Sequence, residues 1–323
     1  MKTLLKKIGI QEKPTAIIPL SGGANNRVYR IDFDKRKPLV YKHYFQHPDD
    51  QRKRLYAEYK FLTYAWNLGL RQIPQPLACD EEKNQALYSF VPGNSVMKAT
   101  EEMIDQAIHF FLDLNKHKKS AKRLPFASEN CLLIEDYFAT VERKLAQCRS
   151  ISPDSPLHRD VKFFIEKALI PRWKNLQKGL LLDLNQSVAT EDLCITPSDF
   201  GFHNALATTK QIYFLDFEYA GWDDPTKTVC DFFCQPKVPI SMKYFEKVAT
   251  AIASTTQKPE VYLNRIKAML PICQFKWCCI ILNAFQKIGG ERRRFSDPDL
   301  LERLEKQFTL AKHYLERISY GLY

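Results

Sequence analysis

The pattern of apolar residues changes after the Pro92-Gly93 dipeptide. Before it, short apolar runs alternate with turn residues, as in strands joined by tight connections. After it, apolar residues recur every three or four positions over long segments, which is typical of amphipathic helices. The sequence therefore predicts an α+β chain with two lobes, a small antiparallel sheet over residues 1–91 and a mostly helical lobe over residues 92–323.

The first lobe is expected to hold four strands and one helix. The helix is expected over Asp49–Leu68, where apolar residues have helical spacing and Gly69 follows as a C-terminal cap. A turn-forming cluster, Ser21–Asn26, separates the first two strands. The expected strands are Ala16–Leu20, Arg27–Phe33, Leu39–Tyr44 and Ala86–Val91.

The second lobe is expected to be helical around one short polar region. Strand character appears in it only at Leu193–Thr196, Ala205–Ala207 and Ile212–Phe217. The expected helices are Ile104–Leu114, Leu132–Gln147, Val161–Leu176, Tyr244–Ser254, Tyr262–Phe285 (with a kink at Pro271) and Pro298–Ile318.

Composition favours a globular protein of the cytoplasm. The 323 residues are 45% apolar and 26% charged, so the chain can bury a large core. The longest apolar run, Trp277–Leu282, is too short to span a membrane, and Lys6 and Lys7 interrupt any signal-peptide core. The nine cysteines form no C-x-x-C pair, so we expect them to be reduced and mostly buried.

The formal net charge of +11 allows two interpretations. The basic runs at Lys35–Lys37, Arg52–Arg54 and Arg292–Arg294 are either solvated surface or a source of attraction for anionic ligands. They carry no interleaved aromatic residues, and no nucleic-acid-binding motif accompanies them. Nucleic acid is therefore not an expected partner, and the sequence makes no prediction of an oligomeric state.

A polar loop and the strand after it bring together three oxygen-bearing side chains. Asp199 and Asn204 have D-x-x-x-x-N spacing, and the next strand ends at Asp216. Phosphoryl transfer needs one carboxylate at the attacking hydroxyl, and an amide and a second carboxylate for magnesium. The alternative is that Asp199 and Asn204 are turn residues and Asp216 caps a strand.

Elements upstream favour the phosphoryl-transfer interpretation. The pair Gly22-Gly23 lies between two strands, where backbone amides can approach phosphates. Lys42 lies in the third strand and Glu58 in the following helix. In a kinase-type site such a lysine holds the phosphates and the glutamate orients the lysine.

On these residues, the chain resembles the aminoglycoside phosphotransferase and choline kinase family, whose members share the protein-kinase-like bilobal fold. The resemblance is most specific in Pro197–Asn204 and Leu215–Asp231. It implies an enzyme, a small-molecule kinase that uses ATP and Mg²⁺. In the protein-kinase signature D-F-G the aspartate binds metal, but we do not assign that role to the literal Asp199-Phe200-Gly201, because no paired aspartate and asparagine lie upstream.

The resemblance also implies roles for individual residues. Asp199 is expected to be the catalytic base, and Asn204 and Asp216 the metal ligands. The nucleotide is expected to contact the phosphate loop, the Lys42–Glu58 pair and a hinge strand that meets adenine. Asp231 is expected to be a buried structural acid. The nucleotide-binding positions are Ser21, Gly22, Gly23, Asn25, Lys42, Glu58, Ser89 and Val91.

One departure from the family opens an alternative function. Pro197 stands where the family usually has a histidine that shapes the loop. Either activity survives this change, or the chain is a catalytically impaired nucleotide-binding module with a regulatory role. His203 either replaces the missing histidine by hydrogen bonding within the loop or is an ordinary loop residue.

The acceptor is expected to be a hydroxyl of a small molecule, sugar-like or an amino alcohol. The segment Lys276–Phe295 carries several cations and only one acid, Glu291, which disfavours a polycationic aminoglycoside. A cage for a quaternary ammonium would need aromatic residues such as Trp222 and Trp277, but residues at such spacing more often belong to a core.

Overall fold

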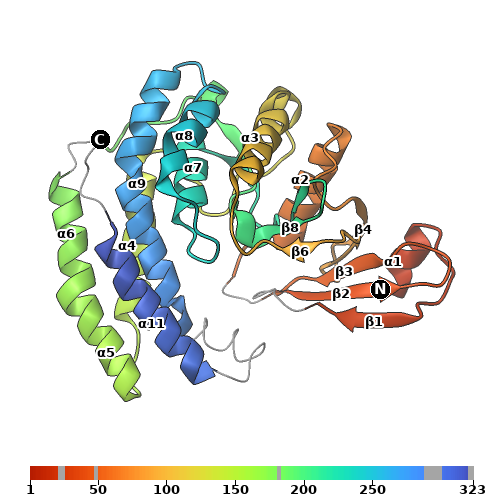
Figure 1. The fold of residues 1–323 in the computed structure, drawn as a ribbon, viewed down its shortest axis with the longest axis horizontal. Helices are drawn as coiled ribbons and strands as arrows, with labels where there is room; N and C mark the ends of the chain where they lie inside the picture. The colour runs from red at the N-terminus through yellow and green to blue at the C-terminus, as the bar shows by residue number, and fades with distance from the viewer. Residues whose placement is uncertain (21–25, 47–49, 180–182, 287–299, 319–323) are drawn as a thin grey trace. The chain divides into compact units, whose positions relative to one another are not determined.

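The computed structural model describes residues 1–20, 26–46, 50–179, 183–286 and 300–318. The chain forms two compact units, each built from three segments (Figure 1). The first unit comprises Met1–Ser128, Cys194–Asp223 and Pro236–Thr255. The second unit comprises Glu129–Leu193, Asp224–Gln235 and Thr256–Tyr323.

The first unit contains a five-stranded antiparallel sheet of order β1-β2-β3-β5-β4. The four expected strands are confirmed to within a few residues at their ends. The fifth, β4, was not predicted, because its run is short, begins with Pro76 and is irregular between Pro76 and Ala78. The strands are β1 (Ala16–Pro19), β2 (Arg27–Asp32), β3 (Leu39–His43), β4 (Pro76–Asp80) and β5 (Gln85–Ser89).

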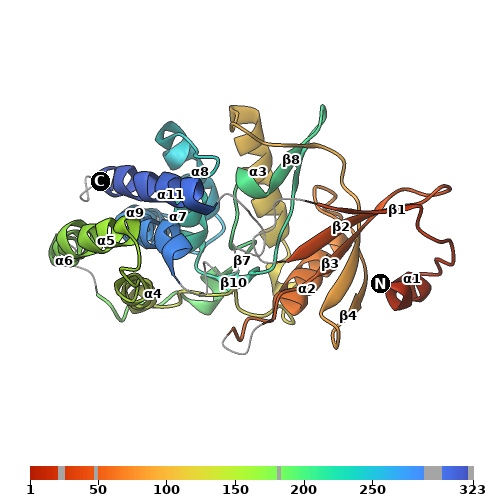
Figure 2. The ribbon, with the colours of Figure 1, turned by 90° about the horizontal axis from the view of Figure 1, so that it is seen from below.

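Two helices cover opposite faces of this sheet (Figure 2). The expected helix is present as α2 (Arg54–Asn67). The other, α1 (Lys2–Lys7), is only six residues long, too short to show a helical period in the sequence. Its side chains Leu4 and Leu5 form a buried cluster with residues of the sheet that include Ile31 and Leu87. Burial of these leucines therefore stabilises α1, which is too short to be stable as an isolated helix.

The remaining segments of the first unit form two smaller sheets and two helices. β7 pairs with β10, and β8 pairs with both β6 and β9. The polar loop identified in the sequence thus lies between two strands, β7 before it and β8 after it. These elements are α3 (Glu101–Asn115), α8 (Phe245–Ala253), β6 (Asn94–Ser95), β7 (Cys194–Thr196), β8 (Ala205–Ala207), β9 (Ile212–Phe214) and β10 (Gly221–Asp223), with short 3₁₀ turns at Lys118–Ser120, Phe202–Asn204 and Met242–Tyr244.

The second unit is helical in its described part. The long helix α9 (Pro259–Ile281) continues through Pro271 and packs against α4 (Ile134–Arg149), α7 (Pro225–Cys234) and α11 (Leu300–Glu316) (Figure 1). Helices α5 (Pro156–Phe164) and α6 (Ile170–Gly179) are joined by a π-helical turn at Ile165–Leu169, and 3₁₀ turns occur at Thr190–Asp192 and Leu282–Phe285.

Within the described residues, one helix is long and apolar enough to cross a membrane. It is Pro259–Phe285, and 72% of its most apolar window is buried inside the protein. Such burial is typical of a core helix. All nine cysteines are free and eight are buried, so the expected burial of most cysteines is confirmed.

Gly221 lies where β10 passes directly over the backbone of residues 125–127. A Cβ placed there would lie 2.3 Å from the Pro125 carbonyl oxygen and 2.6 Å from the Ala127 nitrogen. We predict that Gly221→Ala lowers the free energy of unfolding by about 1–3 kcal/mol, because backbone must move to admit the methyl group. Denaturant titration measures this change.

Gly179→Ala is the matched control, since a Cβ at Gly179 meets no atom within 4 Å. This variant should be neutral or slightly stabilising. Equal unfolding free energies for the two variants would show that the close approach at Gly221 imposes no constraint.

Glu129 of the second unit gives a pH-dependent contribution to stability. Its carboxylate accepts a hydrogen bond of 2.7 Å from Lys144. Partial burial opposes its charge, but Lys144 outweighs burial and lowers the pKa of Glu129 to about 2. A lowered pKa stabilises the folded state above the pKa of the unfolded chain, and this stabilisation is lost as the pH falls toward the folded value.

We therefore predict that Glu129→Gln costs about 1 kcal/mol of unfolding free energy at pH 6. The difference from the unsubstituted protein should shrink between pH 4.5 and pH 2, as Glu129 takes up a proton. Denaturant titrations at several pH values provide the comparison. A difference that stays constant through this range would contradict the assignment.

Candidate functional site

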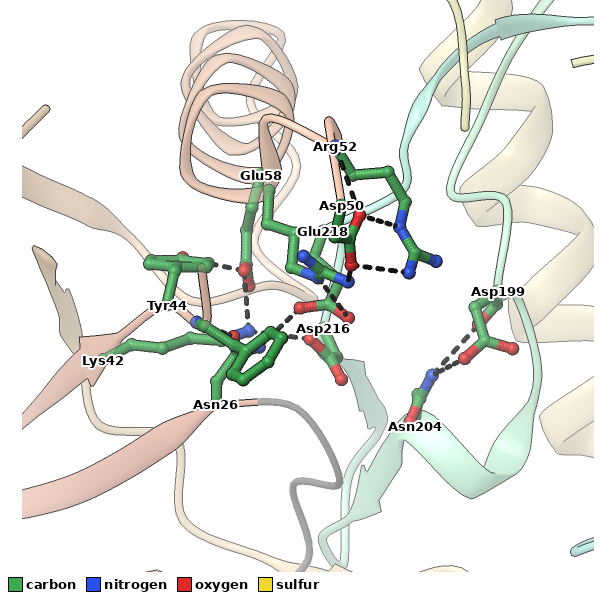
Figure 3. A network of polar contacts seen from close by, with 12 residues as sticks. Asn26, Lys42, Tyr44, Asp50, Arg52, Glu58, Asp199, Asn204, Asp216 and Glu218 are labelled. Atoms are coloured by element: carbon green, nitrogen blue, oxygen red, sulfur yellow. Dashed lines mark hydrogen bonds and ion pairs between the residues drawn. The ribbon is translucent and has the colours of Figure 1, made fainter. Parts of the chain in front are cut away.

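Lys42 is a buried cation held between two carboxylates from distant parts of the sequence (Figure 3). Its Nζ lies 2.7 Å from Glu58 Oε2 and 2.7 Å from Asp216 Oδ1. Glu58 is also buried, whereas the side chain of Asp216 is 37% exposed. The three residues come from β3, from α2 and from the segment after β9. The pairing of Lys42 with Glu58 and Asp216 is the arrangement that the kinase-type interpretation requires.

The charge on Lys42 is fixed by these neighbours. Burial opposes a charged lysine, but the carboxylates of Asp216 and Glu58 outweigh it and hold the pKa of Lys42 well above its usual value. Tyr44 Oη donates a hydrogen bond of 2.8 Å to Glu58 Oε2 and lies 2.6 Å from Tyr88 Oη. The glutamate is therefore oriented by Tyr44, which directly follows β3, as well as by Lys42.

Asp216 lies at a sharp bend after β9. Its φ is +62°, a left-handed conformation that an aspartate tolerates better than most residues. The next residue, Phe217, is buried and stacks on Phe61 of α2 with ring centroids 4.6 Å apart. The bend thus turns the Asp216 carboxylate toward Lys42 while the following side chain enters the core.

Asp199 forms a second polar group with Asn204 and His203. Asn204 Nδ2 donates to the Asp199 carbonyl oxygen at 3.1 Å and to Asp199 Oδ2 at 3.2 Å (Figure 3). His203 Nε2 lies 3.1 Å from Asp199 Oδ1, and its hydrogen must lie on Nε2 because a carboxylate can only accept. The loop hydrogen bond considered for His203 is therefore present. Ser198, just before Asp199, has a φ of +67°.

The two polar groups lie at the same end of a hairpin. The Leu215 N–H donates to the Asn204 carbonyl oxygen at 2.8 Å, and the pairing continues as β8 against β9. Asn204 is therefore opposite the residue that precedes Asp216. Within the first unit, this pairing brings Asn204 close to Asp216, which is 12 positions away in the sequence.

An aromatic core lies beneath both aspartates. Phe200 follows Asp199 in the sequence, as Phe217 follows Asp216, and both phenylalanines are buried. Phe110 of α3 contacts each of them, with ring centroids 6.0 Å from Phe200 and 6.5 Å from Phe217. The literal Asp199-Phe200-Gly201 is thus one of two Asp-Phe pairs anchored in the same core, and Lys42 contacts only the other.

Two polar networks at the site were missed in the sequence. Glu218 is buried, accepts a hydrogen bond from Asn26 Nδ2 and lies 3.5 Å from Arg54 Nε. Arg54 also donates to Asp50 at 2.6 Å, so this network joins α2 to the Asp216 segment. The only feature of the sequence that could have indicated this network is the position of an acid, Glu218, two residues after Asp216.

The second missed network is that of Asn115, which joins α3 to the strand that leads into the polar loop. Its Nδ2 donates to the Ile195 carbonyl oxygen at 3.0 Å, and its Oδ1 accepts from the Ile195 N–H at 2.7 Å. Asn115 is buried, so this pair of hydrogen bonds is shielded from water. Because Ile195 lies four residues before Asp199, Asn115 fixes the start of the loop.

The other expected nucleotide-binding positions differ in what the structure describes. Ser21, Gly22, Gly23 and Asn25 lie outside the described residues. Ser89 ends β5, and its Oγ accepts a hydrogen bond of 2.8 Å from the Gln75 N–H. Val91 is buried, and in the described part of the chain its backbone N–H has no hydrogen-bond acceptor.

Asp231 belongs to a buried ion network in the second unit. It lies between Lys276 and Lys227, and the Trp277 Nε1–H donates to it at 2.7 Å. Burial opposes its charge, but the two lysines hold the pKa of Asp231 below its usual value. The expected buried position of Asp231 is thus confirmed. Lys276, one of the cations that disfavoured an aminoglycoside in the sequence, is thus paired with Asp231 within the second unit.

The described residues contain no group of three or more histidine, cysteine, aspartate or glutamate side chains arranged to hold a metal ion. The expected metal ligands, Asn204 and Asp216, are one amide and one carboxylate. Asn204 turns its Nδ2 toward Asp199, so its Oδ1 faces the other way (Figure 3). Two hard oxygen ligands suit Mg²⁺, which keeps several waters in protein sites.

Comparisons with solved structures identify a shared fold. The gentamicin–APH(2")-IIa complex has 15% sequence identity and a TM-score of 0.61, with 99% of this chain and 96% of that chain covered. Spectinomycin phosphotransferase APH(9)-Ia, solved with ADP and spectinomycin, has 15% identity and a TM-score of 0.60, with 98% and 97% covered. A choline/ethanolamine kinase family protein from Mesorhizobium loti has 17% identity and a TM-score of 0.55, with 98% and 94% covered. These similarities confirm the protein-kinase-like α+β fold class.

The sequence comparisons identify the family. No curated protein sequence matches the chain. The sequence profile of the family described as "Phosphotransferase enzyme family" matches residues 16–233, a range that contains Lys42, Glu58, Asp199, Asn204 and Asp216. Because the match spans more than half of the sequence, the chain belongs to this phosphotransferase enzyme family.

Proposed function

We propose that the protein transfers the γ-phosphoryl group of ATP to a hydroxyl of a small molecule. The observation that carries this proposal is the position of Asp199 and Asn204 on the same hairpin end as Asp216, whose carboxylate binds the buried Lys42. Phosphoryl transfer depends mainly on positioning and on stabilisation of negative charge. The site offers a fixed cation, two oxygen ligands and a separate carboxylate.

The sheet supplies the features expected at the nucleotide end of the site. Lys42 would hold phosphate oxygens, with Glu58 keeping its ammonium in place. Val28 and Ala86 pair directly with Lys42, so their side chains share its face of the sheet, and Leu20 continues that row beyond Val28. Leu20 is 36% exposed, which leaves apolar surface for a base to cover. The Val91 N–H would donate a hydrogen bond to the edge of that base.

The oxygen ligands fit Mg²⁺. Asn204 Oδ1 and the Asp216 carboxylate would hold the ion, and the carboxylate keeps one oxygen, Oδ2, that Lys42 does not contact. A bound magnesium ion neutralises charge on the phosphate oxygens. The protein's own contribution is to hold Asp216 at its left-handed bend and the Asn204 amide in one orientation.

Asp199 would act on the acceptor. Its carboxylate accepts the hydroxyl proton as the oxygen attacks phosphorus, while Asn204 and His203 donate to it and fix its direction. His203 would thus orient Asp199 in place of the histidine that Pro197 replaces. We assign the acceptor to sugar-like compounds and amino alcohols, which present such hydroxyls. The similar structures include proteins solved with gentamicin or with spectinomycin.

We predict that Asp199→Asn lowers phosphoryl transfer at least about a hundredfold, because an amide cannot take the hydroxyl proton. Binding of a non-hydrolysable ATP analogue should be nearly unchanged, since Lys42 and Asp216 remain. ADP release is measured against a panel of sugars, choline, amino alcohols and aminoglycosides. Asp34→Asn, an exposed hairpin residue, is the matched control.

Two results would contradict the proposal in different ways. Unchanged turnover in Asp199→Asn would remove Asp199 from the mechanism. Binding of the ATP analogue without transfer to any acceptor in the panel would favour the regulatory nucleotide-binding module instead.

His203 yields a separate prediction. His203→Ala should lower kcat about tenfold, the effect of losing one hydrogen bond of roughly 1.4 kcal/mol to Asp199, with nucleotide affinity unchanged. His203→Gln keeps a donor at this position and should recover part of the loss. Equal kcat values for the alanine variant and the unsubstituted protein would mean that His203 does not orient Asp199.

A further inference from the structure

A dense basic run follows helix α3 and plays no part in the proposed phosphoryl transfer. Residues 116–123 read Lys-His-Lys-Lys-Ser-Ala-Lys-Arg, with five Lys or Arg and one His in eight positions. Runs of this kind are typical of surfaces that bind polyanions. Ala121 in this run is buried, and its carbonyl oxygen accepts a hydrogen bond from Trp222 Nε1–H at 3.2 Å, which anchors the segment.

The structure shapes part of this run into a groove of about 690 Å³. We call it the basic groove. Four of its lining residues are consecutive basic side chains, and a single acid, Asp113, also lines it. Asn115 in its wall is locked to Ile195 by two hydrogen bonds, so this wall is preformed. The lining residues are Leu112, Asp113, Asn115, Lys116, His117, Lys118, Lys119, Ser120 and Thr255.

Several exposed cations elsewhere in the first unit form ion pairs. Arg36 pairs with Glu12, Arg52 with Asp50 and Lys247 with Asp105. Among the residues that the structure describes, no acid forms an ion pair with Lys116, Lys119, Lys122 or Arg123. The like charges gathered in the basic groove repel one another, and a bound multivalent anion would remove that repulsion.

The helix end explains only part of this charge. Cations near the C-terminus of a helix interact favourably with its last carbonyl groups. Lys116 is the C-terminal cap of α3, so this effect applies to it. This interaction with the helix end fades within one turn, so it does not account for Lys122 and Arg123. It also does not account for the basic groove.

The shape of the groove indicates the kind of anion. Its volume is typical of a site for a small molecule. No aromatic side chain except that of His117 lines it, so it offers little stacking surface to nucleic-acid bases. A flat membrane surface would not fill the basic groove. We propose that the basic groove binds a small molecule that carries two or more phosphate groups, at a place separate from Lys42 and Asp216.

Calorimetric titration with inositol hexakisphosphate and with inorganic tripolyphosphate tests the proposal. The nucleotide site is first saturated with a non-hydrolysable ATP analogue. We expect saturable binding that weakens at least about tenfold in the double variant Lys116→Gln/Lys119→Gln. The matched control is Lys35→Gln/Lys37→Gln, which removes the same charge from an exposed hairpin and should bind as the unsubstituted protein does.

The remaining outcomes would overturn the proposal. An equal loss in both double variants would show general charge attraction rather than a site. The absence of saturable binding would exclude the site outright. If single-stranded RNA or phosphatidylserine vesicles bind through Lys116 and Lys119 while both phosphate probes do not, the groove belongs to a macromolecular surface. None of these outcomes depends on whether the protein transfers phosphate.

Discussion

The buried ammonium group of Lys42 is the constraint on which the site depends. A lysine charge in the interior is costly unless anions lie beside it, and here two carboxylates 2.7 Å away meet that need. They come from α2 and from the segment after β9, so the same interaction that stabilises the cation fixes these elements against the sheet. Removing Glu58 or Asp216 would leave this charge poorly compensated, which is why the three residues act as a unit.

Below this polar layer, aromatic packing sets the positions of the two aspartates. Phe200 and Phe217 are both buried in one core around Phe110. Because each phenylalanine directly follows an aspartate, Asp199 and Asp216 lie at the surface of that core. The positive φ at Asp216 is held by this burial and by the bond to Lys42. The loop therefore keeps a defined geometry although Pro197 occupies the usual histidine position, and His203 contacts Asp199.

The sequence predicted the elements with a clear period and the residues with a chemical signature. Lys42 in a strand, Glu58 on a helix and the Asp199–Asn204 spacing each had such a signal, as did four of the five strands. Helix α1 and strand β4 had too few residues to show a period. Glu218, Arg54 and Asn115 were missed because their importance arises from burial and from partners up to 192 positions away. The ion pair of Lys276 with Asp231 was missed for the same reason, since the two residues are 45 positions apart.

The sequence by itself determined the α+β class, the kinase-type set of polar residues and the order of the elements that carry them. These features are local, because strand and helix periods and motif spacings depend on neighbouring residues. Only the tertiary structure decided that Asp216 joins Glu58 beside Lys42, that His203 as well as Asn204 contacts Asp199, and that part of the run at 116–123 lines a groove. Those properties depend on desolvation and on tertiary contacts, such as those of Lys42 with Asp216, 174 positions apart, and of Asn115 with Ile195, 80 positions apart, which form only when the chain folds.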